Sequence, residues 1–195
     1  MTRPEGPPED LPFRRPTSIP LPSKAHLRTY AEIDGGYTDC YAVDIEAELP
    51  LSDYVTGFYT TWLFRLERLV LHLIAFRPSS DRQIRGFAEG TSDGFAAWAV
   101  EARMEDQLLV RDISGRTRSW FMIKARSLDN AGTTPTTRLY FGSAVVPRRN
   151  KKTNEPELGP VFGFLLGFHK CYSRALLSAA AARLRHKLPI LGSNS

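Results

Sequence analysis

The sequence predicts an α+β fold in which helices cover one face of an antiparallel sheet. Several segments alternate apolar and polar residues with a period of two, as half-buried strands do. The connections between the later strands are short, which favours antiparallel neighbours. A run of alanines near the C-terminal end favours a long final helix. With 195 residues, 42% of them hydrophobic, the chain can bury the core of one domain.

The first predicted strand spans 37–49, and two helices follow it. One face of this strand is apolar and carries Tyr41, Val43, Ile45 and Ala47, and the other carries Cys40, Ala42, Asp44 and Glu46. Ser52 is the expected N-cap of the first helix, because serine readily accepts a hydrogen bond from a backbone amide there. Gly57 together with Thr60 and Thr61 predicts a break before the second helix.

A third helix, four strands and a long final helix complete the predicted order. We expect Ser79 or Ser80 to cap the third helix, which ends near Gly90. The strands are predicted at 95–104, 107–113, 116–126 and 136–147. The pair Ser114–Gly115 indicates a tight hairpin between the second and third of them. The final helix runs from about 158 to 187 and ends before a proline.

The two ends of the chain differ in composition from its middle. Residues 1–36 contain seven prolines and many charges, so we expect a disordered or extended arm. The turn residues of "DGGY", which ends at Tyr37, mark the start of the folded part. We therefore predict a single domain over 37–188, followed by a flexible tail over 189–195.

Charge and cysteine content limit the classes of partner and compartment. The net charge of +5 permits nucleic-acid binding, but the basic stretch Arg148–Lys152 lacks the aromatic residues that bases stack on, so we expect no nucleic-acid partner. Two cysteines exclude a disulfide framework and favour a reducing cytoplasmic location. Apolar runs fall short of about 20 residues, so no membrane span is expected.

The sequence contains no recognisable catalytic or metal-binding motif. The four histidines lack the spacing of metal ligands, so we predict no metal, and no glycine-rich phosphate loop is present, so we predict no cofactor. Ser143 follows a glycine in "FGSAV", but it lies inside a predicted strand instead of at a strand-to-helix turn. A serine nucleophile at this position is therefore not expected.

The final helix holds the first group of candidate ligand-binding residues. Successive residues turn by about 100°, so His169 and Cys171 face opposite sides and cannot form a catalytic dyad. His169 shares its face with Tyr172 and Ser173. Two interpretations stand: a buried histidine held by a hydroxyl, or His169 and Tyr172 as the polar contacts of an apolar pocket.

The predicted strands supply the remaining candidates. Arg118 and Trp120 share one face of the strand 116–126, while Thr117, Ser119, Phe121 and Ile123 share the other. Arg118 is expected to pair with Asp112 or Glu101 on the surface, or to hold a ligand anion. Tyr140 and Ser143 of the next strand complete the candidate set.

Four stretches, "FAAWAVEAR", "DQLLVRDISGRTRSW", "TRLYFGSAVVP" and "LGPVFGFLLGFHKCYSRALL", carry a resemblance to a known superfamily. Their order resembles START-like (SRPBCC or Bet v 1-like) proteins, and in particular is similar to uncharacterised bacterial DUF2867-type domains. The resemblance implies a helix-grip-like curved antiparallel sheet with the long C-terminal helix packed on its concave face. It also implies a cavity between them, without fixed catalytic residues.

Three functions are compatible with the sequence. The first is binding of a small apolar or amphipathic ligand between the sheet and the final helix. The second is a cyclase- or dehydratase-type enzyme that uses His169 or Tyr172 as its acid or base. The third is an interaction module that forms a homodimer through the outer face of the sheet.

Overall fold

The computed structural model describes residues 12–62, 64, 80–127, 135–150, 153–158 and 160–187, and within the final helix it describes side chains from Lys170 to His186. Several expectations lie outside these residues. They concern the first eleven residues, the second predicted helix, the loop 128–134 and the C-terminal tail.

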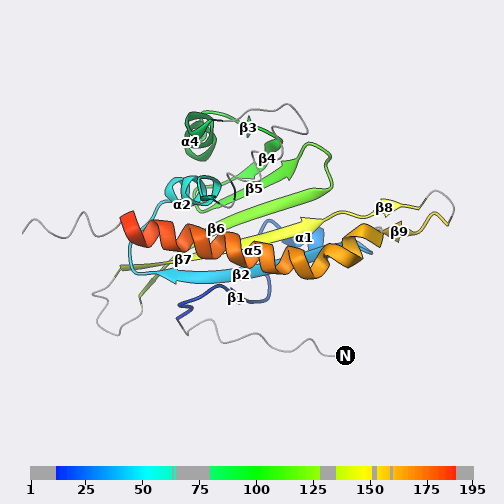
Figure 1. Ribbon diagram of the computed structural model, residues 1–195, viewed down its shortest axis with the longest axis horizontal. Helices are drawn as coiled ribbons and strands as arrows, with labels where there is room; N and C mark the ends of the chain where they lie inside the picture. The colour runs from blue at the N-terminus through cyan, green and yellow to red at the C-terminus, as the bar shows by residue number, and fades with distance from the viewer. Residues whose placement is uncertain are drawn as a thin grey trace, which may run out of the picture.

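The structure is α+β and is built on a seven-stranded antiparallel sheet (Figure 1). The strands are β1 (Thr17–Ser18), β2 (Tyr37–Ile45), β3 (Gly94–Phe95), β4 (Trp98–Arg103), β5 (Gln107–Asp112), β6 (Thr117–Ser127) and β7 (Pro135–Val145). They lie in the order β1-β2-β7-β6-β5-β4-β3. A separate two-stranded ribbon joins β8 (Arg148–Arg149) to β9 (Pro156–Glu157). The predicted antiparallel strands are thus confirmed, with the first of the four divided into β3 and β4.

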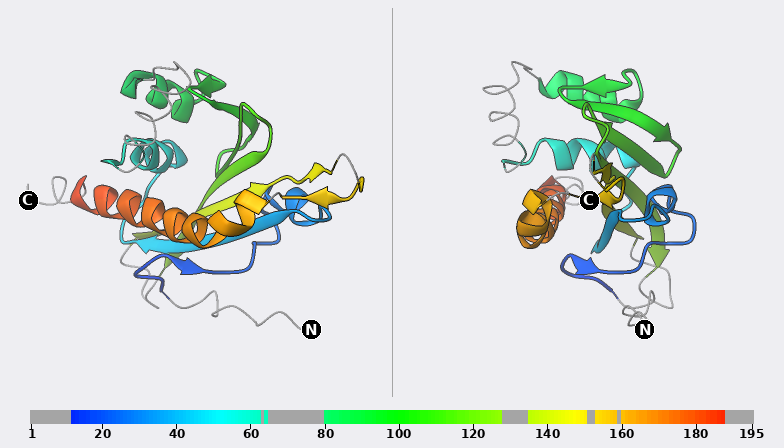
Figure 2. Two further views of the ribbon diagram at one scale, coloured as in Figure 1. Left: turned by 45° about the vertical axis from the view of Figure 1, so that its right-hand side comes forward. Right: turned by 90° about the vertical axis from the view of Figure 1, so that its right-hand side faces the viewer.

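Of the helices that the structure describes, three lie on one side of this sheet (Figure 2, left). They are α2 (Leu51–Tyr59), α4 (Asp81–Glu89) and α5 (Pro160–Lys187). Helix α5 packs against β2, β7 and α2, while α2 also contacts β6 and α4. Their apolar side chains pack against the inner face of the sheet, which is the face that these helices cover. Together they form one large core cluster that includes Phe58, Phe121 and Leu177.

The caps of α4 agree with the prediction, whereas the start of α2 does not. The Ser80 hydroxyl accepts from the Gln83 amide at 3.3 Å, and Gly90 ends α4 with a φ of 85°. Helix α2 begins at Leu51 with the extended residue Pro50 as its N-cap, so the prediction of Ser52 as N-cap is wrong. Proline suits a helix boundary and not its interior, which explains why the helix begins directly after it.

Residues 12–36 pack against the outer face of the sheet, the face opposite α5, and so differ from the expected disordered or extended arm (Figure 2, right). They include β1, which pairs with β2, and α1 (Arg28–Ala31). Phe13 and Leu27 are buried in a second core cluster together with Trp120 and Tyr140. The outer face is apolar as well, and covering it removes that surface from water.

A buried ion pair joins β2 to β7 on the outer face. Arg138 donates from Nε to Asp44 Oδ1 at 2.7 Å and from Nη2 to Oδ2 at 2.9 Å. The Asp44 carboxylate also accepts from the backbone amide of Phe13 at 2.8 Å. The Arg138 guanidinium lies 4.0 Å from the centre of the Phe13 ring. This pair therefore connects the central strands to the N-terminal segment.

Gly142 of β7 provides the space in which Leu27 docks. A Cβ atom at position 142 would lie 2.7 Å from Leu27 Cδ2 and 2.9 Å from the Asp39 carbonyl oxygen. Both distances are shorter than van der Waals contact. The glycine in "FGSAV" thus allows the N-terminal segment to approach the sheet backbone.

We expect Arg138→Met to destabilise the protein by about 3–5 kcal/mol, because it leaves the buried Asp44 carboxylate without its bidentate partner. Urea denaturation measures the change in the free energy of unfolding. Arg111→Met, at an exposed position of β5, is the matched control and should stay within about 0.5 kcal/mol of wild type. Equal changes in the free energy of unfolding for the two variants would contradict a stabilising role of the Asp44–Arg138 ion pair.

Gly142→Ala should lower stability by about 1–3 kcal/mol through overpacking against Leu27. A double-mutant cycle with Leu27→Ala measures the coupling, since the smaller residue makes room for the new methyl group. The double variant should be more stable than the sum of the two single effects implies. Strict additivity would contradict the docking of Leu27 over Gly142.

Candidate functional site

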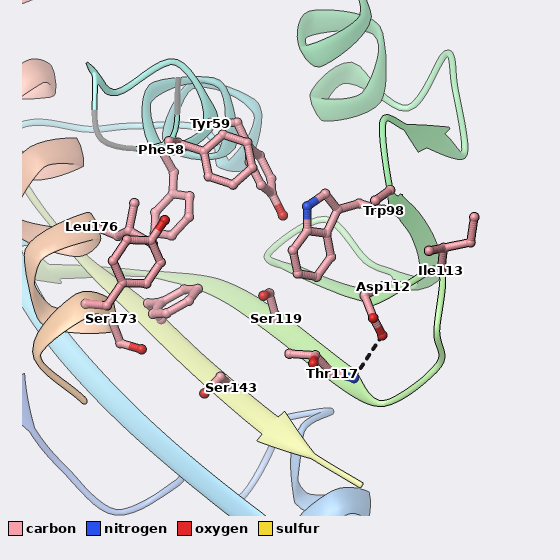
Figure 3. A pocket seen from close by; sticks show the side chains of 14 residues that line it. Phe58, Tyr59, Trp98, Asp112, Ile113, Thr117, Ser119, Ser143, Ser173 and Leu176 are labelled. Carbon is pink, nitrogen blue, oxygen red and sulfur yellow. Dashed lines mark hydrogen bonds between the residues drawn. The ribbon is translucent and has the colours of Figure 1, made fainter. Parts of the chain in front are cut away.

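A cavity of about 340 Å³ lies between the sheet and helices α2 and α5, and it is partly open to solvent (Figure 3). Its lining residues come from α2, from β6 and β7, from the ends of β4 and β5, and from the middle of α5. They are Phe58, Tyr59, Phe64, Ala97, Trp98, Asp112, Ile113, Thr117, Ser119, Phe141, Ser143, Tyr172, Ser173 and Leu176.

Two serines on neighbouring strands form the polar floor of the cavity. Ser119 of β6 and Ser143 of β7 are directly paired in the antiparallel register. The Ser143 hydroxyl donates to Asp39 Oδ1 at 2.6 Å, and the same oxygen accepts from the Ser143 amide at 3.0 Å. Because both side chains are short, space remains above this part of the sheet.

Aromatic rings form the wall that lies toward α2. The ring centres of Phe58 and Phe141 are 4.8 Å apart, and those of Phe58 and Tyr59 are 5.5 Å apart at a steep angle. Tyr59 also meets Phe64 edge to face at 4.7 Å. Leu176 of α5 adds an aliphatic side. The cavity is therefore largely apolar, as small-molecule sites usually are.

Three polar groups border this apolar space, and one of them is a buried donor. The indole nitrogen of Trp98 is buried, and no hydrogen-bond acceptor for it exists among the residues that the structure describes. The hydroxyls of Ser119 and Ser173 belong to buried side chains that also line this space. Buried polar groups normally have partners, so these groups are available to an occupant or to water.

Asp112 is the charged residue of the lining, and its carboxylate is engaged by the adjacent hairpin. Its Oδ1 accepts from the backbone amides of Arg116 and Thr117, each at 2.9 Å, and its Oδ2 accepts from the amide of Ser114 at 3.3 Å. These bonds hold the turn between β5 and β6. Asp112 therefore acts primarily as a turn residue.

Two tyrosines of β2 are held in their neutral form. Burial, and secondarily the nearby Asp39 carboxylate, raises the pKa of Tyr41 to about 12. Burial likewise raises the pKa of Tyr37, whose hydroxyl donates to Asp39 Oδ2 at 3.2 Å. At neutral pH both phenols keep their protons, and that of Tyr37 donates to Asp39.

The structure brings only part of the predicted set together. Tyr172 and Ser143 line the cavity. His169 belongs to α5, but its side chain lies outside the described residues. The other three candidates, Arg118, Trp120 and Tyr140, lie on the outer face of the sheet, away from the cavity.

The outer-face candidates already have protein partners. The Trp120 indole donates to Gln107 Oε1 at 2.9 Å, and Tyr140 is packed in the second core cluster. Arg118 Nε lies 3.1 Å from Glu101 Oε2, which is one of the two acidic partners expected for it. The alternation predicted for β6 is confirmed, with Trp120 and Phe121 in different clusters.

Sequence reasoning missed Trp98, Phe58, Ser119 and Ser173 as cavity residues. Ser119 and Ser143 could have been found together, because the hairpin register places them opposite each other, close to the apolar pair Phe121 and Phe141. Trp98 gave no such signal, since its environment depends on how α2 packs across the sheet.

The chain matches no protein-family model and no curated protein. Among the described residues, no group of three or more His, Cys, Asp or Glu side chains could hold a metal ion. Within the same part of the chain, no helix has both the length and the apolar character needed to span a membrane. The site must therefore be interpreted from its own geometry.

We expect the two cysteines to differ sharply in reactivity. Cys171 is exposed on α5, whereas Cys40 is buried, and its burial raises the pKa of the thiol. Maleimide should add one label to the folded protein, as measured by intact mass, and Cys171→Ser should abolish that label. Rapid labelling of Cys40 in the folded protein would contradict the packing of the N-terminal segment over β2.

Proposed function

We propose that this protein binds a small apolar or amphipathic molecule in the cavity between β6, β7, α2 and α5. The observation that carries the proposal is a largely aromatic cavity of about 340 Å³ with a few convergent polar groups. Such a combination is typical of small-molecule sites, whose volumes begin near 300 Å³. The apolar lining supplies affinity, and the serines and the Trp98 indole supply orientation.

We further propose a helix-grip arrangement of the START-like kind, with α5 on the concave face of the sheet. Support comes from the order of elements, in which two helices follow the first long strand and the longest helix comes last. The contacts of α5 with β2 and β7 are consistent with this arrangement. The free thiols of Cys40 and Cys171 support the expected reducing, cytoplasmic location.

An enzyme of the cyclase or dehydratase type is the alternative function. The position of Tyr172 in the cavity lining favours it, because a neutral phenol there can donate a proton or a hydrogen bond to an occupant. Dimerisation through the outer sheet face has less support, since residues 12–36 cover much of that face.

Filling the cavity should weaken ligand binding. Ser173 lines the cavity and is buried, so Ser173→Leu places a larger apolar side chain in the space that a ligand needs. We expect the affinity for aminoanthracene, a neutral fluorescent polycyclic amine, to fall by at least about tenfold, which corresponds to about 1.4 kcal/mol. Fluorescence titration measures this change.

Ser178→Leu is the matched control, because it makes the same substitution at an exposed position of the same helix. Its affinity should equal that of wild type, and circular dichroism should show that both variants fold. Native mass spectrometry of the purified wild-type protein should in addition detect a co-purified small molecule. A clean protein that binds neither aminoanthracene nor any member of a panel of apolar compounds would refute the proposal.

A further inference from the structure

The indole of Trp98 is a donor that requires an acceptor from outside the described chain. Trp98 lies at the start of β4, in register with Asp112 of β5. Figure 3 shows its ring projecting into the space bounded by Phe58 and Tyr59. An indole nitrogen can only donate, and a buried donor without a partner is costly. The occupant of the cavity should therefore present a hydrogen-bond acceptor at this point.

The charges of the lining argue against an anionic occupant. Among the described residues that line the cavity, Asp112 is the one with a charged side chain, and that charge is negative. A second carboxylate, that of Asp39, lies beside Ser143 on the neighbouring strand β2. A carboxylate or phosphate in this apolar space would be desolvated without a cation to pair with, which is strongly unfavourable.

A cationic group is not favoured either. The Asp112 carboxylate is occupied by the backbone amides of the hairpin, and an ammonium group cannot accept the hydrogen of the Trp98 indole. The acceptor should therefore belong to a neutral group, such as a ketone, an aldehyde or an ester.

The shape of the lining favours a flat aromatic skeleton. Phe58, Tyr59 and Phe141 present rings to the cavity, and rings of this kind pack favourably with another ring in offset or edge-on contact. The volume of about 340 Å³ lies near the lower limit for small-molecule sites. It suits a compact skeleton of about two or three fused rings with a short substituent.

We propose that the cavity binds a neutral, flat aromatic carbonyl compound, whose carbonyl oxygen accepts from the Trp98 indole nitrogen. This inference rests on the proposed ligand-binding function and narrows it to one chemical class. The hydroxyls of Ser119 and Ser173 orient further polar atoms of the ligand. The aromatic wall at α2 holds the ring system.

Three compounds that share one ring system test the inference: acetonaphthone carries a neutral carbonyl, ethylnaphthalene lacks the acceptor, and naphthoate is an anion. Isothermal titration calorimetry on the full chain measures their affinities. Acetonaphthone should bind about tenfold more tightly than ethylnaphthalene, because it alone of these two satisfies the buried donor. Naphthoate should bind at least about tenfold more weakly than acetonaphthone.

Trp98→Phe keeps an aromatic ring but removes the donor. The ratio of acetonaphthone to ethylnaphthalene affinity should fall from about ten to about one in this variant. Trp62→Phe is the matched control at an exposed tryptophan, and it should retain the wild-type ratio. Should Trp98→Phe fail to fold, nitrogen-edited NMR of the wild-type protein replaces it. The indole N–H resonance of Trp98 should then move downfield with acetonaphthone and not with ethylnaphthalene.

The outcomes separate this inference from the function on which it rests. Equal binding of the three compounds, preference for naphthoate, or an unchanged ratio in Trp98→Phe overturns the aromatic carbonyl class while ligand binding stands. Binding of aminoanthracene without binding of acetonaphthone likewise overturns the aromatic carbonyl class and leaves the proposed ligand binding intact. Failure of all these compounds, aminoanthracene included, overturns both proposals.

Discussion

The structure depends on Asp44, a buried acidic residue that connects three parts of the chain. Its carboxylate holds Arg138 in the neighbouring strand β7 and accepts from the amide of Phe13 in the N-terminal segment. Its backbone carbonyl accepts from Arg185, near the end of α5, at 2.9 Å. A paired charge in such a place is costly to desolvate and very costly to leave unpaired. Asp44 therefore connects the central strands, the N-terminal segment and the last turns of α5 to one another.

The two faces of the sheet differ in how they are covered. The N-terminal segment covers the outer face with buried apolar side chains, and Leu27 lies directly over Gly142. On the inner face, α5 lies over β2 and β7, whereas α2 reaches β6. Between the two helices the sheet carries Ser119 and Ser143 in place of large side chains, so the space is not filled. The cavity thus results from small residues at these two positions of the sheet, within an otherwise packed core.

Much of this fold could be predicted from the sequence, because its strands and caps depend on local patterns. The pattern at Ser80 and Gly90 and the hairpin at Ser114–Gly115 are set by residues within a few positions of each other. The candidate site was harder, because the middle of β6 and of β7 carries apolar residues on both faces. Nothing local distinguishes Trp120, which faces the N-terminal segment, from Phe121, which faces the helices. The prolines of the first 36 residues indicated a lack of regular structure, but a segment can be irregular and still bury Phe13 and Leu27.

The pairing of β2 with β7 also affects how the protein can fold during its synthesis. The two partners of the central ion pair are 94 residues apart in the chain. During synthesis, β1 and β2 can pair early, but β2 lacks its other neighbour until β7 has left the ribosome. Long-range pairing of this kind slows folding and leaves apolar strands open to association with other chains. We expect the nascent chain to rely on chaperones until its last third has emerged, after which the sheet can close in one cooperative step.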